Sequence, residues 1–233
     1  MKYHAVIFDL FGTLVDNTEF LDVSGAEYNR TLSNVAAALS VPEPDLLRLW
    51  SGTVHERDSG FFPTMEDYFQ YICRESGVRA DAQQIAHAVE LRIDYLRGAL
   101  TPRSGTIETL TELRASGHKI GLISDCSLEV SILWAKTPFA PLVDVAVLSA
   151  EVGLTKPDPR IFEIACQRLQ ASPDCCLYVG DGGSRELTGA STFGMDVVLI
   201  RASNDTVTGN REEWQGARIS SIKEILALVC DKA

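Results

Sequence analysis

Apolar and polar positions follow a strand-like pattern at the start of the chain and again throughout its second half. Short apolar runs rich in β-branched residues cover residues 5–10, 119–124, 143–148, 176–180 and 197–200. Most of these runs are apolar on both faces, which is typical of strands buried in a parallel sheet. The pattern therefore predicts five buried strands.

Segments with helical periodicity separate the later strands. They cover residues 105–116, 128–136, 159–169 and 185–193, and a closing amphipathic helix is expected over 221–229. Alternation of strand and helix predicts an α/β fold, with a parallel sheet and helices on both faces. The polar stretch 201–216 is expected to be an excursion on the surface.

The region after the first strand breaks this alternation. It contains no convincing strand and shows helical periodicity in four segments: 28–39, 45–54, 65–75 and 82–96. Four helices inserted at this point predict an all-helical cap of residues 16–99. The body is then formed by residues 1–15 and 100–233.

Composition narrows the possible partners. The 233 residues carry 21 basic and 32 acidic side chains, a net charge of −11, which argues against a nucleic-acid or anionic membrane surface. No apolar run approaches the roughly 20 residues of a membrane span, and no signal peptide is recognisable at the N-terminus. Six cysteines without CxxC spacing predict reduced thiols rather than structural zinc. We expect a cytoplasmic monomer or homodimer that acts on a small anionic molecule.

Polar side chains gather where the predicted strands end. They are Asp9, Thr13, Ser124, Asp125, Lys156, Asp181 and Glu186. Singly, Asp9 or the Ser124-Asp125 pair could cap a turn or helix, and Lys156 could be solvated. Independent caps would not be expected to gather acids, hydroxyls and a lysine at one end of one sheet. This is the end where open parallel sheets bind ligands.

The set is chemically coherent. Asp9 could act as a carboxylate nucleophile that forms a covalent intermediate, which water later hydrolyses. A Mg²⁺ ion held by Asp9 and Asp181 would reduce the charge repulsion that opposes attack on a phosphoryl group. Thr13 and Ser124 could donate hydrogen bonds to charged oxygens, and Lys156 could supply positive charge.

The segments "FDLFGTL", "LISDCS", "KPDP" and "YVGDGGSREL" occur in this order. In order and spacing they resemble the four signature motifs of the haloacid dehalogenase superfamily of hydrolases. The resemblance covers roughly residues 1–15 and 100–200, and the helical insert lies where that family carries its smaller cap. It implies a Rossmann-like body and an aspartyl intermediate at Asp9.

The same resemblance implies roles for the other motif residues. Asp9, Asp181 and the main-chain carbonyl of Phe11 would coordinate the metal, and Glu186 would orient its waters or lie close to them. Ser124 and Lys156 would bind the anionic group of the substrate.

Phe11 departs from the phosphatase pattern of that family. Its phosphatases carry a second Asp at this position, which protonates the departing alkoxide, and loss of a general acid typically costs about 10²–10⁴ in rate. An aromatic residue here resembles the 2-haloacid dehalogenases, whose halide leaves without a proton. Those enzymes work without a metal and have serine and asparagine near the end of the fourth strand, whereas this chain has Asp181 and Glu186.

Three functions stay open on this sequence. The metal-binding acids favour, by a narrow margin, a Mg²⁺-dependent phosphohydrolase with a good leaving group, or with an acid supplied by the substrate or the cap. The alternatives are a dehalogenase-like reaction at carbon and a phospho-ligand binding protein with attenuated turnover.

Substrate recognition is expected to come partly from the cap segment "VHERDSGFFPT". His55 and Arg57 could contact a substrate anion, and Phe61 and Phe62 could line the pocket. Alternatively, the segment is a helix end whose aromatic rings pack between cap and body. Arg57 is the first candidate, because a guanidinium suits bidentate recognition of a carboxylate or phosphate. Phe11 and Asp125 complete the expected substrate-binding set, although Asp125 could instead cap a helix or support the metal site.

Overall fold

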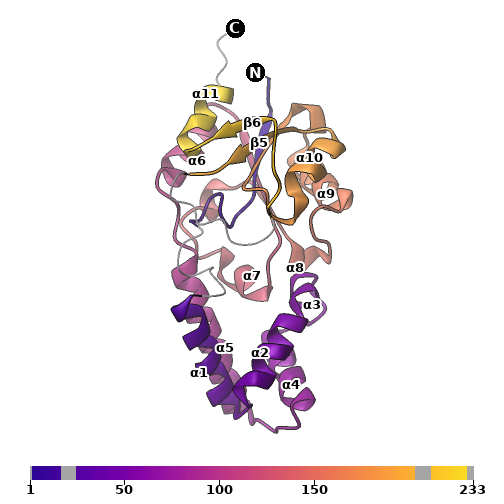
Figure 1. Cartoon of the computed structure of the whole chain (residues 1–233). Helices are drawn as coiled ribbons and strands as arrows, with labels where there is room; N and C mark the ends of the chain where they lie inside the picture. Colours follow the sequence, from indigo (N-terminus) through magenta and orange to yellow (C-terminus); the bar gives the residue numbers. More distant parts are fainter. Residues whose placement is uncertain (1, 17–24, 203–210, 230–233) are drawn as a thin grey trace.

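The computed structural model describes residues 2–16, 25–202 and 211–229. Its centre is a parallel sheet of six strands in the order β3-β2-β1-β4-β5-β6 (Figure 1). The strands are β1 (Ala5–Phe8), β2 (Lys119–Ser124), β3 (Val145–Leu148), β4 (Cys176–Gly180), β5 (Asp196–Ile200) and β6 (Ala217–Ile219). The predicted α/β fold class is confirmed, and β6 is a short edge strand that the sequence pattern did not predict.

Strand β1 lies at the centre of the sheet and contributes to both hydrophobic cores of the body. Val6 and Phe8 belong to one core, whereas Ala5 and Ile7 belong to the other. This division follows from the two-residue period of a strand, because successive side chains point to opposite faces. Both faces are covered, which is why the strand reads as a continuous apolar run.

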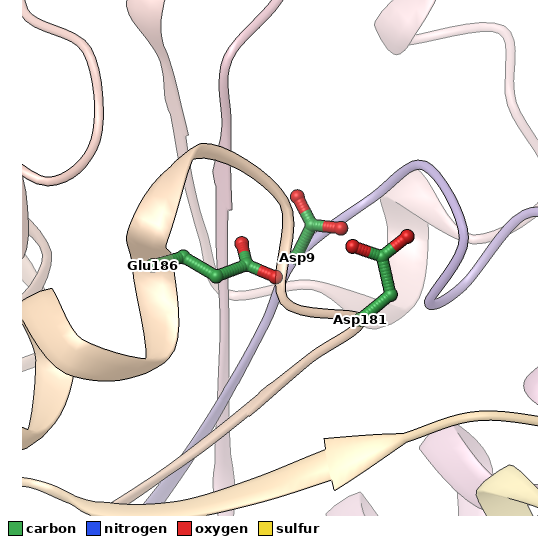
Figure 2. Close-up of side chains that lie close together, drawn as sticks. All are labelled: Asp9, Asp181 and Glu186. Carbon is green, nitrogen blue, oxygen red and sulfur yellow. The ribbon is translucent and has the colours of Figure 1, made fainter. Parts of the chain in front are cut away.

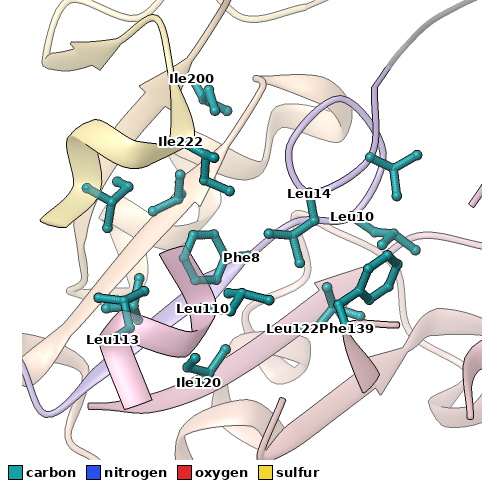
Figure 3. Close-up of a cluster of buried hydrophobic side chains, with 14 of the residues drawn as sticks. Phe8, Leu10, Leu14, Leu110, Leu113, Ile120, Leu122, Phe139, Ile200 and Ile222 are labelled. Atoms are coloured by element: carbon teal, nitrogen blue, oxygen red, sulfur yellow. The ribbon is translucent and has the colours of Figure 1, made fainter. Parts of the chain in front are cut away.

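Helices cover both faces of the sheet. Leu110 and Leu113 of α6 (Thr106–Ala115) pack on the Phe8 side, as part of the cluster in Figure 3. Ile225 of α11 (Ile225–Val229) belongs to the same core. Helices α9 (Pro159–Leu169) and α10 (Glu186–Phe193) pack on the Ile7 side. Two further helices, α7 (Leu128–Trp134) and α8 (Ser149–Val152), follow β2 and β3.

The inserted helices extend away from the body and have a core of their own (Figure 1). They are α1 (Ala26–Leu39), α2 (Glu43–Gly52), α3 (Val54–Asp58), α4 (Met65–Glu75) and α5 (Ala82–Ala99). Helix α3 is the one that periodicity did not separate, because its five residues bury no side chain. Val15 pairs with Pro102 in an isolated β-bridge, so the chain leaves and re-enters the body at one place.

Two further expectations concern the whole molecule. No helix within the described ranges is long and apolar enough to cross a lipid bilayer. The described cysteines form no disulfide bonds with one another, and Cys230 lies outside the described residues.

Candidate active site

The polar residues predicted at the strand ends converge at one edge of the sheet. Asp9 directly follows β1, Ser124 ends β2, and Asp181 directly follows β4. Because β1 is hydrogen-bonded to both β2 and β4 in parallel, these three ends lie side by side. The topology therefore brings together residues that are more than 100 positions apart in the chain.

Asp9 is held at both carboxylate oxygens. Its Oδ1 accepts a hydrogen bond from Nζ of Lys156 at 2.6 Å, and its Oδ2 accepts one from Oγ1 of Thr13 at 3.1 Å. All three side chains are buried. The carboxylate is therefore held by two hydrogen-bond donors and shielded from bulk water.

Lys156 is fully enclosed between two acids. Its Nζ donates to Asp9 and also to Oε2 of Glu186 at 2.5 Å. Burial lowers the pKa of Lys156, but the carboxylates of Asp9 and Glu186 outweigh it and raise this pKa well above its ordinary value. The lysine therefore carries its positive charge next to the Asp9 carboxylate.

Asp125 positions the segment that carries this lysine. Its Oδ1 accepts a hydrogen bond from the main-chain N–H of Lys156 at 2.9 Å, next to the cis peptide bond between Lys156 and Pro157. Ser124 is buried, and its Oγ donates a long hydrogen bond of 3.5 Å to the carbonyl of Asp125. The contacts of Asp125 are those of a supporting residue, and its contact with substrate stays a prediction.

Glu186 lies at the start of α10, and its side chain points inward toward Asp9. Its Oε1 accepts from the N–H of Gly182 at 3.0 Å, and its Oε2 accepts from the hydroxyl of Tyr178 at 2.9 Å as well as from Lys156. Burial, with a contribution from Asp9, raises the pKa of Glu186 to about 7. A side chain at Gly180 would come within 2.2 Å of Oε1, so this glycine makes the room that Glu186 occupies.

Tyr178 belongs to the site although the sequence analysis did not select it. It lies in the middle of β4 and is completely buried. A buried tyrosine hydroxyl needs a hydrogen-bond partner. A tyrosine in an otherwise apolar strand therefore predicts a polar partner nearby, and this signal could have identified Tyr178 from the sequence.

Asp181 accepts a hydrogen bond from the N–H of Gly183 at 2.9 Å through Oδ1 and forms an ion pair with Arg211 through Oδ2. Arg211 comes from the stretch that was expected to be a surface excursion. That expectation is wrong for residues 211–212, which dock on the loop after β4. A polar, glycine-containing stretch carries no periodicity that would predict this docking, since the partners become neighbours only in the folded chain.

The side chains of Asp9, Asp181 and Glu186 point toward one another (Figure 2). Asp9 and Asp181 follow the ends of β1 and β4, and Glu186 is the first residue of α10. Each offers a carboxylate oxygen, and these oxygens lie within 4.8 Å of one another. A cluster of oxygen donors with an excess of negative charge fits a hard divalent cation such as Mg²⁺. The donor chemistry thus agrees with the predicted metal site.

Phe11 lies in the turn after β1, where it forms an isolated bridge with Val15. Its ring is partly buried and packs against the hydrophobic core of the body. The Phe11 side chain cannot donate a proton, and its effect on the chemistry of the site stays a prediction.

Arg57 contacts other residues of the inserted helices α1 to α5, which we call the cap. Its Nη1 donates to the carbonyl of Trp50 at 2.5 Å and to the hydroxyl of Tyr68 at 2.9 Å, and the guanidinium lies 4.1 Å from the centre of the Trp50 ring. Phe62 is buried, whereas Phe61 is 70% exposed. The described contacts of Arg57 favour a role in holding α2, α3 and α4 together, and its contact with substrate stays a prediction.

The end of α3 brings a further acid to the junction between cap and body. Burial raises the pKa of Asp58 from an ordinary value of 3.8 to about 6, with Arg57 opposing this shift and the charges of Asp125 and Glu129 adding to it. The adjacent turn packs closely on α8, since a side chain at Gly60 would come within 2.2 Å of the carbonyl of Ala150. Asp58 is therefore a titratable group near β2 that the sequence analysis did not select.

Comparison with known proteins places these motifs in a family. A family model described as a haloacid dehalogenase-like hydrolase matches residues 3–194. Glyceraldehyde 3-phosphate phosphatase of Methanopyrus kandleri is 28% identical over an alignment 234 residues long, which covers 98% of this chain and 98% of that relative. (S)-2-haloacid dehalogenase of Pseudomonas fluorescens is 27% identical, over 85% of this chain and 84% of the relative.

Solved structures agree on the fold. A 2-haloacid dehalogenase from Pseudomonas syringae superposes with a TM-score of 0.71 at 21% sequence identity, covering 97% of this chain and 98% of that chain. Phosphatases and dehalogenases both occur among the similar proteins, so the comparisons support a hydrolase and leave its leaving group open.

Proposed function

Because this chain belongs to the haloacid dehalogenase-like hydrolase family, we propose that it is a Mg²⁺-dependent phosphohydrolase acting on a small phosphorylated molecule with a good leaving group. The buried trio of Asp9, Asp181 and Glu186 carries this proposal. The 2-haloacid dehalogenases that the first motif resembles have serine and asparagine near the end of the fourth strand. Two acids in that region favour chemistry at phosphorus.

The trio would hold the ion, and the carbonyl of Phe11 is proposed as a further ligand. When bound, Mg²⁺ supplies positive charge that offsets the repulsion between a phosphoryl group and the carboxylates. The remaining roles belong to side chains of this chain, and their contacts support the assignment.

Asp9 is proposed to attack phosphorus with one carboxylate oxygen while the bond to the leaving-group oxygen breaks. Water then hydrolyses the aspartyl phosphate and regenerates the carboxylate. Lys156 and Thr13 already donate to the two oxygens of Asp9 and thereby orient it. Ser124 and Lys156 are proposed to bind the transferred group, where donors fixed in advance stabilise the charge that develops.

The leaving group follows from Phe11. No proton can come from this side chain, so an alkoxide with a high pKa would leave slowly. Acyl and aryl phosphates release stable anions and need no proton from the enzyme. We also propose that the protein acts in the cytoplasm, as a monomer or homodimer.

A paired assay tests this proposal. Phosphate release is measured from acetyl phosphate, p-nitrophenyl phosphate and glycerol 2-phosphate, and halide release from 2-chloropropionate, each with and without EDTA. We expect release from the acyl and aryl phosphates that EDTA abolishes and added Mg²⁺ restores, with the alkyl ester about 10²-fold slower or worse. Asp9→Asn is the matched control, because it keeps the size of the side chain and removes the nucleophile.

The second candidate is a dehalogenase-like hydrolase, favoured by the aromatic residue Phe11 two positions after Asp9 in the sequence. Halide release that survives EDTA, with no phosphate release under any condition, would replace the first proposal with this one. Binding of phosphorylated ligands without turnover would instead indicate a binding protein of the same fold.

A further inference from the structure

Residues 211–212 form a clasp over the loop that carries Asp181. The N–H of Glu212 donates to the carbonyl of Gly182 at 2.9 Å. Its Oε2 accepts from the N–H groups of Leu187 at 2.9 Å and Thr188 at 3.3 Å. A carboxylate at this place satisfies N–H groups that the first turn of α10 leaves without helical partners. Arg211 is thereby fixed beside the metal-binding loop.

The guanidinium of Arg211 reaches into the site. It forms an ion pair with Oδ2 of Asp181, and the two side chains are only 13% and 5% exposed. Burial lowers the pKa of Arg211, while the charge of Asp9 acts in the opposite direction and that of Arg103 adds to the lowering. The arginine therefore lies within electrostatic reach of Asp9 as well, and an arginine stays charged at any ordinary pH.

Two cations of the chain offset part of the negative charge of the trio. Asp9, Asp181 and Glu186 carry up to three negative charges, and Lys156 and Arg211, which contact them, carry two positive charges. Each of the three acids contacts one of the two cations. A divalent ion that binds the trio must bind Asp181, and it would then lie next to the guanidinium and be repelled by it.

We propose that Arg211 and Mg²⁺ contend for Asp181, so that the clasp sets how tightly this site binds a divalent cation. The inference rests on the proposed function, because it takes the trio as the metal site. Tight binding then requires the guanidinium to move away from Asp181, and the position of residues 211–212 controls the availability of the metal site.

Titration with MgCl₂ by isothermal calorimetry tests the contention directly. Arg211→Gln is expected to lower the Kd for Mg²⁺ at least about tenfold, because the competing charge is removed. Arg185→Gln is the matched control. Arg185 is exposed and lies in the loop that carries Asp181, and its replacement changes the net charge by the same amount as Arg211→Gln. Its Kd is expected to stay within about twofold of the unchanged protein.

Further variants define the outcomes. In the double variant Arg211→Gln with Asp181→Asn, the lower Kd for Mg²⁺ expected of Arg211→Gln should be lost. The inference is wrong if Arg211→Gln leaves the Kd within about twofold, if it weakens binding, or if neither protein binds Mg²⁺. Phosphate release from acetyl phosphate, measured on the same preparations, decides the proposed function separately.

If Arg211→Gln does not fold, hydrogen exchange on the unchanged protein provides an independent test of the inference. On addition of Mg²⁺, amide deuterium uptake is expected to rise in a peptide covering residues 211–216 and to stay constant in β5. Unchanged or lower uptake in 211–216 would show that the clasp does not move when the ion binds.

Discussion

Two regions of the described chain can be compared because each buries ion pairs: the carboxyl edge of the sheet, and the junction between the cap and α7. At the sheet edge, Lys156 contacts Asp9 and Glu186, and Arg211 contacts Asp181. At the junction, Arg92 of α5 pairs with Glu129 of α7 at 3.4 Å, and both side chains are less than 10% exposed. Both regions therefore bury ion pairs.

The surroundings of these pairs differ. The guanidinium of Arg92 lies 4.6 Å from the centre of the Trp50 ring and 5.1 Å from that of Tyr95. The guanidinium of Arg57 lies 4.1 Å from the centre of the same Trp50 ring and 5.4 Å from that of Tyr68. At the sheet edge, by contrast, acids outnumber cations and converge within 4.8 Å. Convergent charge with an acid in excess suits catalysis, whereas one-to-one pairing against aromatic rings suits adhesion between cap and body.

Replacing Lys156 at the sheet edge is expected to have the largest effect, because it should reduce both stability and turnover. Lys156→Met leaves Asp9 and Glu186 buried without their cation, and we expect a loss of about 3–5 kcal/mol in the free energy of unfolding. Turnover of acetyl phosphate should fall by about 10³-fold or more, because the nucleophile loses its orienting donor and the transferred group loses a cation. Chemical denaturation and phosphate release measure the two losses. Unchanged turnover in a folded variant would contradict the catalytic assignment.

Removing one partner of the buried ion pair at the junction should lower stability without changing turnover. Glu129→Ala leaves Arg92 buried without its partner, and we expect a loss of about 3–5 kcal/mol in the free energy of unfolding. Below the melting temperature, kcat should stay within about threefold of the unchanged protein. Asp94→Ala, which breaks the exposed pair with Arg97, is the control and should cost less than about 1 kcal/mol.

Asp58 gives a pH-dependent test of the junction. The folded state raises its pKa from 3.8 to about 6, so the folded protein binds more protons than the unfolded chain between these values. Its contribution to the free energy of unfolding therefore falls as pH rises from about 4 to about 6 and is constant above.

Asp58→Asn removes this dependence. Relative to the unchanged protein, the variant should gain about 1–3 kcal/mol in the free energy of unfolding between pH 4 and pH 7. Urea denaturation across this range measures the difference, and Asp67→Asn, an exposed acid in the cap, is the control. Parallel pH profiles for Asp58→Asn and the unchanged protein would show that Asp58 is not desolvated.

Arg57→Lys is expected to have the smallest effect. Lysine keeps the charge and loses the fork that reaches the Trp50 carbonyl and the Tyr68 hydroxyl, which should cost about 1 kcal/mol in stability. KM for acetyl phosphate should not change if the role of Arg57 lies within the cap. A rise in KM of tenfold or more at unchanged stability would instead support the contact with substrate that the sequence suggested.

The sequence by itself determined the layered fold and the set of residues at the strand ends. Local periodicity encodes strands and helices, and parallel pairing then places the residue after each strand at the same edge. Asp9, Ser124 and Asp181 could be brought together by that rule alone, whereas Lys156 and Glu186 were selected through the motifs that contain them. Their signal survives in the sequence because each is a polar residue at the end of an apolar run or in a recognisable motif.

Only the tertiary structure decided what each side chain contacts. Tyr178 reads as one more apolar position of β4 until Glu186 is folded beneath it. Arg211 lies in a stretch without periodicity and reaches Asp181 only because Glu212 docks on α10, 25 residues away from Leu187. Arg57 suggested an anion site by its chemistry, yet the aromatic rings of the cap surround it. Such contacts join positions distant in sequence, and the free energy of each depends on burial, which no local pattern records.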